Sequence, residues 1–310
     1  MAGSLGNYII PTYLYEGKDP SGPSRRDSSP CIIMASTRRL TKPLSRLLST
    51  ALIFNYIFPC FILVYMAVLG LLLSLLHMAR NPKHIVFLRQ WRTSFLEAAQ
   101  PSLFALSDML LSGAKRELLN YAHGVVLEVG AGRGHTLKYY DPAKVSKAWA
   151  VEPNERSIRA LNREILQLGL GGTYQTLRCG IEDAETLHNV GIIDGSVDTV
   201  VCILSLCTIP KPRDIISDLY SLIKPTGGQL LFLEHVASEH PLTRIVQNWY
   251  TSLIWRYVSG GCELNRDTAK WCIEDTRNGG ETRWTSVEVH TIAGGWCNVF
   301  PHISGRLTKA

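Results

Sequence analysis

The sequence predicts an α/β fold in which a mostly parallel β-sheet is covered by helices on both faces. From residue 125 onward, apolar runs of strand length alternate with segments of helix length. The first run, V-V-L-E-V, leads directly into a turn with three glycines, which allow the chain to turn tightly. Strands that alternate with helices pair in parallel, because each helix returns the chain to the edge of the sheet where the previous strand began.

The expected elements follow one another in regular order. Apolar residues at helical spacing predict one or two helices between residues 84 and 122. The expected strands are residues 125–129, 148–152, 173–178, 197–204 and 228–235. The expected helices begin near Gly134 and cover residues 155–168 and 213–223.

The basic residues are concentrated near the N-terminus. The chain of 310 residues has a formal net charge of +6, but seven basic and only three acidic residues precede Leu47. Much of the excess therefore lies outside the predicted domain, which argues against a basic groove for nucleic acid. Residues 1–46 lack apolar periodicity, so we expect them to be disordered. No metal site is expected, because the eight cysteines show no zinc-ligand spacing.

A long uncharged segment precedes the predicted domain. Residues 47–78 contain no Asp, Glu, Lys or Arg, and about 20 apolar residues suffice to span a bilayer. We therefore expect a membrane anchor at 47–79, a helical linker at 80–114 and a catalytic-size domain at 115–310. A buried core helix and a transit peptide are the alternatives, and Pro59 leaves a re-entrant hairpin open. Basic residues on both sides of the segment leave its orientation open.

The glycine turn, E-V-G-A-G-R-G, spans residues 128–134. Backbone without Cβ atoms lets a ligand approach the N–H groups of such a turn. A dinucleotide-binding turn reads G-x-G-x-x-G and requires glycine at position 135, where this chain has His135. The spacing therefore argues against a dinucleotide.

Two acids accompany this turn. Glu152 ends the second expected strand, where a carboxylate can accept hydrogen bonds from both hydroxyls of a ribose. Its alternative is a solvated residue at a strand end. Glu128 lies inside the first strand, where an acid is costly unless it is paired. Its alternative is a buried carboxylate bonded to backbone amides.

Four segments resemble, in order, the motifs of the class I S-adenosylmethionine-dependent methyltransferases. They are E-V-G-A-G-R-G, C-G-I-E-D-A, D-G-S-V-D-T-V-V-C-I-L-S-L-C and L-I-K-P-T-G-G-Q-L-L-F-L-E-H. The resemblance implies a Rossmann-like, seven-stranded, mostly parallel sheet whose last strand is antiparallel. It also implies S-adenosyl-L-methionine as the cofactor, held by Glu128, Gly130, Ala131, Gly132, Gly134, Glu152, Pro153, Ile181, Glu182 and Asp183.

The same resemblance implies a role for several of these side chains. Glu128 helps to hold the cationic methionine end of the cofactor. Ile181 lies against the adenine ring, and Glu182 or Asp183 accepts a hydrogen bond from the exocyclic amine. Asp183 has a plain alternative as the cap of the helix that follows.

From about residue 50 to its end, the chain is similar to the small membrane-anchored thiol methyltransferases of the methyltransferase-like group. The similarity rests on the apolar anchor, L-E-V-G-A-G-R-G, D-G-S-V-D-T-V-V-C-I-L-S-L-C, L-F-L-E-H-V-A, G-G-C-E-L-N-R-D-T and P-H-I-S-G. It implies a membrane of the endoplasmic reticulum or lipid droplet, a domain that faces the cytosol, and lipophilic small-molecule thiols as acceptors. Two features depart from the family: the 46 residues before the anchor, and E-P-N in place of D-P-N. The longer Glu152 should still bind a ribose, with a slightly different reach.

His235 is the candidate catalytic residue because it ends the strand 228–235, at the sheet edge where ligands bind in open α/β folds. A thiol, with an ordinary pKa of about 8.5, needs only such mild help to ionise. The alternative for His235 is a structural bond to the following loop. Cys207 lies at the same edge but is expected to pack, and a structural role is expected for His302. Residues 248–257 are aromatic enough to form a substrate lid or to touch a membrane.

Two other functions stay open. One is O-, N- or C-methylation of a lipophilic metabolite, such as an intermediate of secondary metabolism. The other is a membrane-bound scaffold that binds the cofactor without turnover. The eight scattered cysteines are expected to be reduced thiols in a cytosol-facing domain.

Overall fold

The computed structural model describes residues 88–274, 282–293 and 298–309, together with five scattered positions between residues 68 and 79. The predicted N-terminal segment, 1–46, lies outside the described residues, and so does the predicted anchor, 47–79, apart from those five positions. Within the described parts of the chain, no helix is both long and apolar enough to cross a membrane.

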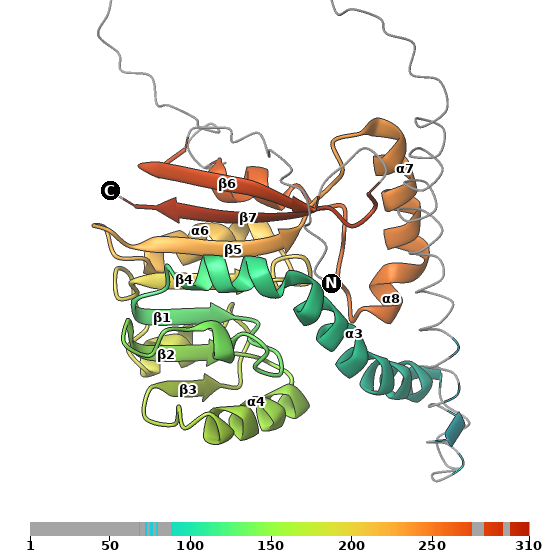
Figure 1. Ribbon diagram of the computed structural model, residues 1–310, viewed down its shortest axis with the longest axis horizontal. Helices are drawn as coiled ribbons and strands as arrows, with labels where there is room; N and C mark the ends of the chain where they lie inside the picture. The colour runs from blue at the N-terminus through green and yellow to red at the C-terminus, as the bar shows by residue number, and fades with distance from the viewer. Residues whose placement is uncertain are drawn as a thin grey trace, which may run out of the picture.

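Seven strands of the described chain form one sheet (Figure 1). They are β1 (Gly124–Val129), β2 (Val145–Val151), β3 (Tyr174–Leu177), β4 (Thr199–Ile203), β5 (Gln229–His235), β6 (Ser286–Ala293) and β7 (His302–Thr308). The strand order is β3-β2-β1-β4-β5-β7-β6, and β1 to β5 pair in parallel. The last strand, β7, runs antiparallel to both β5 and β6. The predicted mostly parallel sheet with an antiparallel last strand is confirmed.

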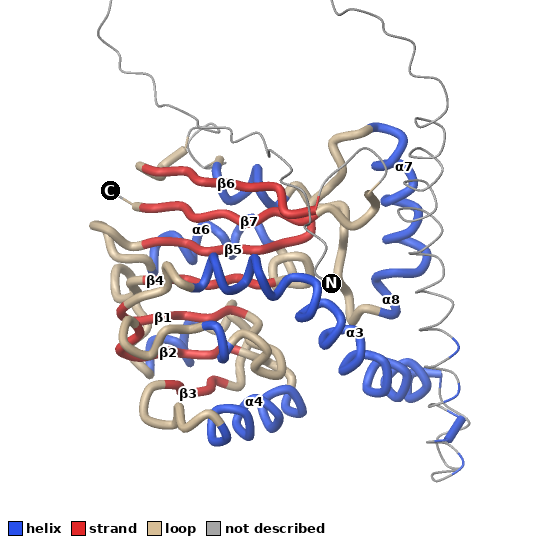
Figure 2. The backbone as a smooth tube through the Cα atoms, viewed as in Figure 1, coloured by secondary structure: helices blue, strands red, loops and turns tan. Residues whose placement is uncertain are grey.

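Helices cover both faces of this sheet. The helices of the described chain are α3 (Leu88–Leu119), α4 (Glu155–Gln167), α5 (Ala184–Asn189), α6 (Pro212–Leu222), α7 (Pro241–Tyr250), α8 (Arg256–Val258) and α9 (Thr268–Ile273), of which α7 and α8 lie beside the sheet rather than on its faces (Figure 1). Leu118 of α3 and Leu161 of α4 pack on one face, and Leu187 of α5 and Leu219 of α6 pack on the other. Figure 2 shows α3 across one side of the strands and α6 on the opposite side.

The position of each strand in the sheet explains its sequence pattern. All seven residues of β5 are buried, because it lies between β4 and β7 with helices on both faces. A strand covered on both faces reads as an almost continuous apolar run, as L-L-F-L does here. The strand order reverses between β1 and β4, and ligands bind at the carboxyl ends of the strands at such a point.

The segment between the glycine turn and β2 differs from the prediction. The expected helix near Gly134 is a single 3₁₀ turn, η3 (Leu137–Tyr139). Gly134 has a left-handed φ of +90°, and Pro142 ends the available segment a few residues later. The segment between them is short, and its conformation is set by packing, since Leu137, Tyr139 and Tyr140 are buried in the core. Hydrogen-bond donors for a ligand must therefore come from the glycine turn itself rather than from the N-terminus of an α-helix.

The helix α3 is one continuous helix, and its C-terminal part belongs to the core. Asp108 accepts a hydrogen bond from Lys115 at 2.9 Å, and both side chains are buried. The same carboxylate pairs with Lys138 of η3 at 2.6 Å and accepts from the hydroxyl of Tyr139. These contacts tie α3 to the chain that follows the glycine turn, so residues before the expected domain start at 115 contribute to the core.

The N-terminus of α4 offers a test of local structure beside the glycine turn. The Asn154 side chain caps α4 by accepting hydrogen bonds from the N–H groups of Arg156 and Ser157. We expect Asn154→Ala to lower the free energy of unfolding by about 1 kcal/mol, because a helix N–H loses its partner. Asn154→Asp keeps the cap and should be neutral within about 0.5 kcal/mol. Urea unfolding of the three proteins measures the difference, and equal losses in both variants would contradict the capping argument.

Candidate functional site

The glycine turn lies at the carboxyl end of β1, next to the chain that follows β4. Gly130 and Gly132 have φ values of +70° and +56°, in the left-handed region that favours glycine. A Cβ atom at Gly130 would lie 2.7 Å from the Cβ atom of Ser205, whereas a Cβ atom at Gly132 would meet nothing within 4 Å. Gly130 is therefore required by close packing, and Gly132 leaves an open approach to the backbone. Ala131 between them is buried.

Glu152 directly follows β2 and binds the glycine turn. Its Oε2 atom accepts the N–H of Gly132 at 2.9 Å, and its Oε1 atom accepts the N–H of Asn154 at 2.8 Å. Burial raises the pKa of Glu152, and these two N–H groups partly offset the rise. Each carboxylate oxygen keeps a further lone pair. Glu152 is thus not a solvated residue at a strand end, and it can accept hydrogen bonds from a ligand. Pro153, which follows it, is exposed.

Glu128 is buried in β1 beneath the turn. Its Oε1 atom accepts the hydroxyl of Thr136 at 2.5 Å, whereas its Oε2 atom is buried with no hydrogen-bond partner among the described residues. Burial raises the pKa of Glu128 to about 7, although the hydroxyls of Thr136 and Tyr140 and the charge of Lys115 favour the ionised form. The partner is a side chain, so the alternative of a carboxylate bonded to backbone amides does not hold. A buried oxygen without a partner is costly unless a ligand binds it.

The expected adenine segment forms the turn between β3 and α5. Asp183 caps α5 by accepting from the N–H and the hydroxyl of Thr186, at 3.1 and 2.7 Å. These bonds lower the pKa of Asp183. Ile181 is half-buried against the core, and Glu182 is exposed. The capping role of Asp183 is confirmed. Glu182 does not cap the helix, so of the two acids it is the one that can accept a hydrogen bond from a ligand.

Glu234, which the sequence analysis missed, fixes the chain after β4. This buried residue of β5 accepts the N–H groups of Ser205, Leu206 and Cys207 at 2.8, 2.8 and 3.3 Å. Burial raises the pKa of Glu234 well above its usual range. The three bonds hold Ser205 against Gly130. Glu234 therefore supports the glycine turn although it lies two strands away from β1. An acid within the apolar run L-L-F-L-E-H was the signal that could have revealed it.

His235 is the last residue of β5, at the predicted edge of the sheet. It is buried, and its ring centroid lies 4.3 Å from that of His302, its partner on β7. Burial, and then the neighbouring His302, lower the pKa of His235 well below its usual value. Burial also lowers the pKa of His302 to about 4. Both rings are therefore neutral near pH 7. Since Nδ1 of His235 has no hydrogen-bond partner among the described residues, the ring can accept a hydrogen bond but is a weak base.

Cys207 packs rather than facing an open site. Its Sγ atom lies 3.1 Å from that of Cys262 and 3.4 Å from the carbonyl oxygen of Leu204. Both thiols are buried, with Trp255 and Leu264 around them. The expectation that Cys207 packs is confirmed.

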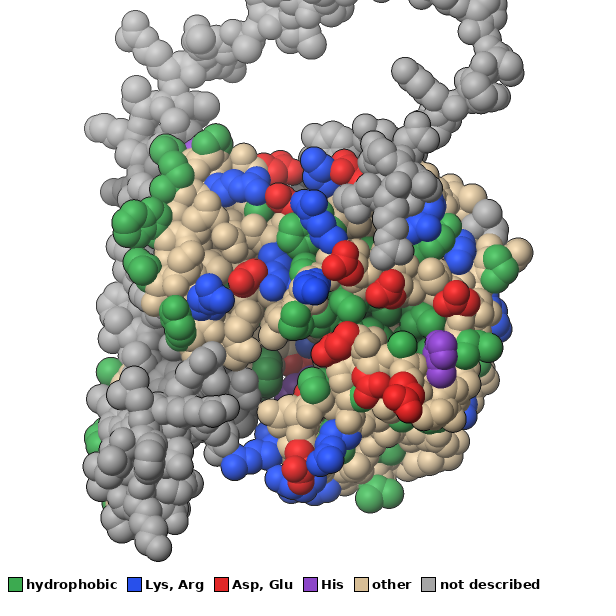
Figure 3. Space-filling model, turned by 180° about the vertical axis from the view of Figure 1, so that it is seen from behind, with side chains coloured by type: hydrophobic (Ala, Val, Ile, Leu, Met, Phe, Trp, Pro, Cys, Tyr) green, Lys and Arg blue, Asp and Glu red, His purple; other side chains and the backbone are tan. Residues whose placement is uncertain are grey.

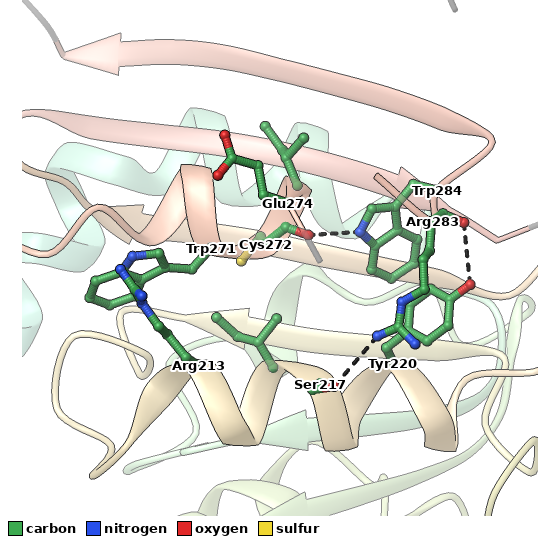
Figure 4. A pocket seen from close by; sticks show the side chains of 10 residues that line it. Arg213, Ser217, Tyr220, Trp271, Cys272, Glu274, Arg283 and Trp284 are labelled. Atoms are coloured by element: carbon green, nitrogen blue, oxygen red, sulfur yellow. Dashed lines mark hydrogen bonds between the residues drawn. The ribbon is translucent and has the colours of Figure 1, made fainter. Parts of the chain in front are cut away.

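Two cavities lie away from the glycine turn. One of about 590 Å³ adjoins the loop after β5, and its lining includes the charged residues Glu239, Arg244, Asp267 and Lys270. The other, of about 20 Å³, lies between α6 and α9 (Figure 4), and its lining includes Trp271 and Trp284. It has room for about one water molecule. Neither lining contains Glu128, Glu152 or the glycines.

The residues at the carboxyl ends of β1 and β2 fit the cofactor that the motifs imply. S-adenosylmethionine carries an ammonium group and a positively charged sulfur, and the site provides two buried carboxylates whose burial disfavours their charge. A cation relieves that cost. Gly132 leaves room for a ligand beside the backbone, and the Oε2 atom of Glu128 has no hydrogen-bond partner within bonding distance among the described residues.

Comparisons with known proteins agree with this site. A family model for a methyltransferase domain matches residues 108–276. Thiol S-methyltransferase TMT1B of Homo sapiens is 26% identical over 240 residues, covering 74% of this chain and 93% of that protein. Thiol S-methyltransferase TMT1A of Homo sapiens is 28% identical over 184 residues, covering 59% and 70%. An O-methyltransferase family protein from Burkholderia thailandensis has the same fold, with 15% identity, a TM-score of 0.51, and 78% and 70% of the two chains covered.

Proposed function

Because the chain belongs to the family of methyltransferase domains and is an S-adenosylmethionine-dependent methyltransferase, we propose that it methylates the thiol of a small lipophilic acceptor. The observation that carries the cofactor part is the buried carboxylate of Glu128 next to the glycine turn that Glu152 holds. The thiol part is supported by the names of the two human relatives.

The chemistry at the edge of β5 supports a thiol as the acceptor. When bound, S-adenosylmethionine supplies a methyl group already activated by its positively charged sulfur. A thiol with a pKa of about 8.5 ionises with little help, whereas an aliphatic alcohol needs a strong base. Burial lowers the pKa of His235, so His235 is a weak base, which suits a thiol acceptor better than an alcohol.

The residues of this chain would then align the two reactants and exclude water. Glu128 and Glu152 would hold the cofactor at two ends, and Glu234 would keep the chain after β4 in place against the glycine turn. Orientation of this kind accounts for much of the rate acceleration in group transfer. His235 would accept a hydrogen bond from the acceptor thiol.

We place the enzyme at a membrane of the endoplasmic reticulum or lipid droplet, with its domain facing the cytosol.

A matched screen of acceptors tests this proposal. The full chain, with S-adenosylmethionine, is offered a thiol, a phenol, an amine and a carboxylic acid that share one apolar body, and methylated products are measured by mass spectrometry. We expect the thiol to be methylated fastest, and Glu128→Gln to lose the activity with every acceptor. Methylation of the phenol or amine but not the thiol would instead support O- or N-methylation of a lipophilic secondary metabolite. Cofactor binding without any methylated product would support a scaffold.

A further inference from the structure

The helical segment after β5 buries three polar side chains and exposes six large apolar ones. It consists of α7, a π-helical turn η4 (Thr251–Trp255) and α8, which follow one another without a break. Thr243, Gln247 and Thr251 are buried. Six large apolar side chains are 42–68% exposed: Leu242, Ile245, Val246, Trp249, Leu253 and Tyr257. A surface helix of a globular domain ordinarily shows the opposite arrangement.

These six exposed residues form one stripe. Apart from the adjacent pair Ile245 and Val246, successive positions differ by three or four residues, a spacing that places side chains on one face of a helix. We call them the α7 stripe. Figure 3 shows hydrophobic side chains gathered along the edge of the domain where α7 lies. Contiguous exposed apolar side chains of this kind mark an interaction surface.

Buried hydrogen bonds keep the stripe facing outward. The Oε1 atom of Gln247 accepts the N–H of Ser238 at 2.8 Å, and its Nε2 atom donates to the carbonyl oxygens of Val236 and Leu264, each at 2.9 Å. Rotating α7 to bury the stripe would break all three bonds. The outward orientation is therefore built into the fold.

We propose that the α7 stripe docks on the surface of a lipid bilayer. The segment from residue 241 to 258 contains no acidic residue, and its two cations, Arg244 and Arg256, pair with Asp267 at 2.9 Å and with Glu263 at 4.0 Å. Docking would therefore depend on the apolar side chains of the stripe, as in helices that lie in the plane of a membrane surface. Trp249 and Tyr257 are residue types that prefer the boundary between lipid and water. Large aliphatic side chains between them add apolar area that a bilayer can bury.

The chain before the described domain favours a bilayer over another occupant. Residues 47–78 carry no charged side chain, and α3 begins at Leu88, only a few residues later. α3 also packs against α8, so the stripe lies on the side of the domain that α3 contacts. A bilayer that holds residues 47–78 is thus within reach of the α7 stripe. The stripe would be a second contact, which fixes the orientation of the domain rather than its attachment.

Docking in this orientation has a consequence for the acceptor. Val236 and Ser238, which Gln247 holds, belong to the loop that directly follows His235. The bilayer would therefore lie close to the loops at the carboxyl edge of β5, where a lipophilic acceptor dissolved in lipid could enter.

Fluorescence quenching by lipid tests the proposal on the full chain. The protein is reconstituted in phosphatidylcholine and phosphatidylserine vesicles, with or without bromine atoms in the acyl chains, which quench tryptophan only on contact. We expect brominated lipid to quench the wild type, and Trp249→Phe to lose most of that quenching. Trp271→Phe, which removes a tryptophan of α9 away from the stripe, should leave it unchanged. S-adenosylmethionine binding confirms that each variant is folded.

Two results would overturn the proposal. The first is equal quenching of the wild type and Trp249→Phe by brominated lipid. The second is a Trp249 signal that is shielded from aqueous iodide but not quenched by the lipid, which would mean that a second copy or another protein covers the stripe.

As a second variant, Ile245→Glu with Leu253→Glu should shift the Trp249 emission to the red in vesicles. Leu166→Glu with Ile193→Glu, equally exposed apolar positions elsewhere, should leave that emission unchanged.

Discussion

Replacing Glu152 with alanine is expected to weaken the binding of S-adenosylmethionine by about 1.5–3 kcal/mol, which corresponds to roughly a tenfold to 150-fold higher Kd. Two losses contribute. The variant lacks a carboxylate that can accept charge-assisted hydrogen bonds from the ribose of the cofactor. It also leaves the N–H of Gly132 without its partner, so the glycine turn loses its bond to the end of β2. Titration calorimetry with the cofactor and with its demethylated product measures both affinities.

Glu155 provides the matched control for this experiment. It lies three residues further along, is exposed, and pairs with Arg159 on the surface of α4. Glu155→Ala removes the same charge but should change cofactor affinity by less than about 0.5 kcal/mol. If Glu152→Ala binds the cofactor as tightly as Glu155→Ala does, Glu152 has only a structural role.

The parallel part of the sheet could be predicted from the sequence because buried parallel strands leave a simple pattern. The expected strand 197–204 contains β4 (Thr199–Ile203), and the expected strand 228–235 contains β5 (Gln229–His235). Both are covered on two faces and therefore appear as apolar runs between turn residues. The glycine turn and Glu152 were predicted for a similar reason, since local spacing places them at adjacent strand ends.

Contacts between distant segments could not be predicted in this way. Glu234 acts on Ser205, Leu206 and Cys207 only because β4 and β5 are neighbours, and nothing in the local sequence states that pairing. Asp108 belongs to the core only because α3 crosses the segment that contains Lys138. The 3₁₀ turn after Gly134 was missed because tertiary packing, rather than helix propensity, decides so short a segment.

The affinity for S-adenosylmethionine is expected to rise with pH between 4.5, the ordinary glutamate pKa, and about 7, the pKa of buried Glu128. Below about pH 7 the carboxyl group of Glu128 is increasingly protonated and cannot pair with the ammonium group of the cofactor. Kd should therefore rise by up to about tenfold for each pH unit that the pH falls within this range. Glu152, whose pKa is also raised, adds a contribution of the same sign. His302, with a pKa of about 4, is neutral throughout this range.

Glu128→Gln removes the main titrating group and keeps its size. We expect this variant to bind the cofactor weakly at every pH, with a much shallower pH dependence than the wild type. Calorimetric titrations at several pH values measure the slope. A wild-type slope that survives in Glu128→Gln would assign the pH dependence to another group, with Glu152 as the first to replace.

The same substitution should stabilise the cofactor-free protein above pH 7. The pKa of Glu128 is higher in the folded protein, at about 7, than the ordinary value of 4.5, so its favourable contribution to folding is complete below 4.5 and lost as the pH rises through 7. Above 7 the wild type carries a buried charge that glutamine lacks, and Glu128→Gln should raise the free energy of unfolding by up to about 3 kcal/mol. Urea unfolding at both ends of this range measures the gain, which should vanish below pH 4.5. A residue that lowers stability and raises cofactor affinity is kept for the ligand, whereas a loss of stability at every pH would make Glu128 a structural residue.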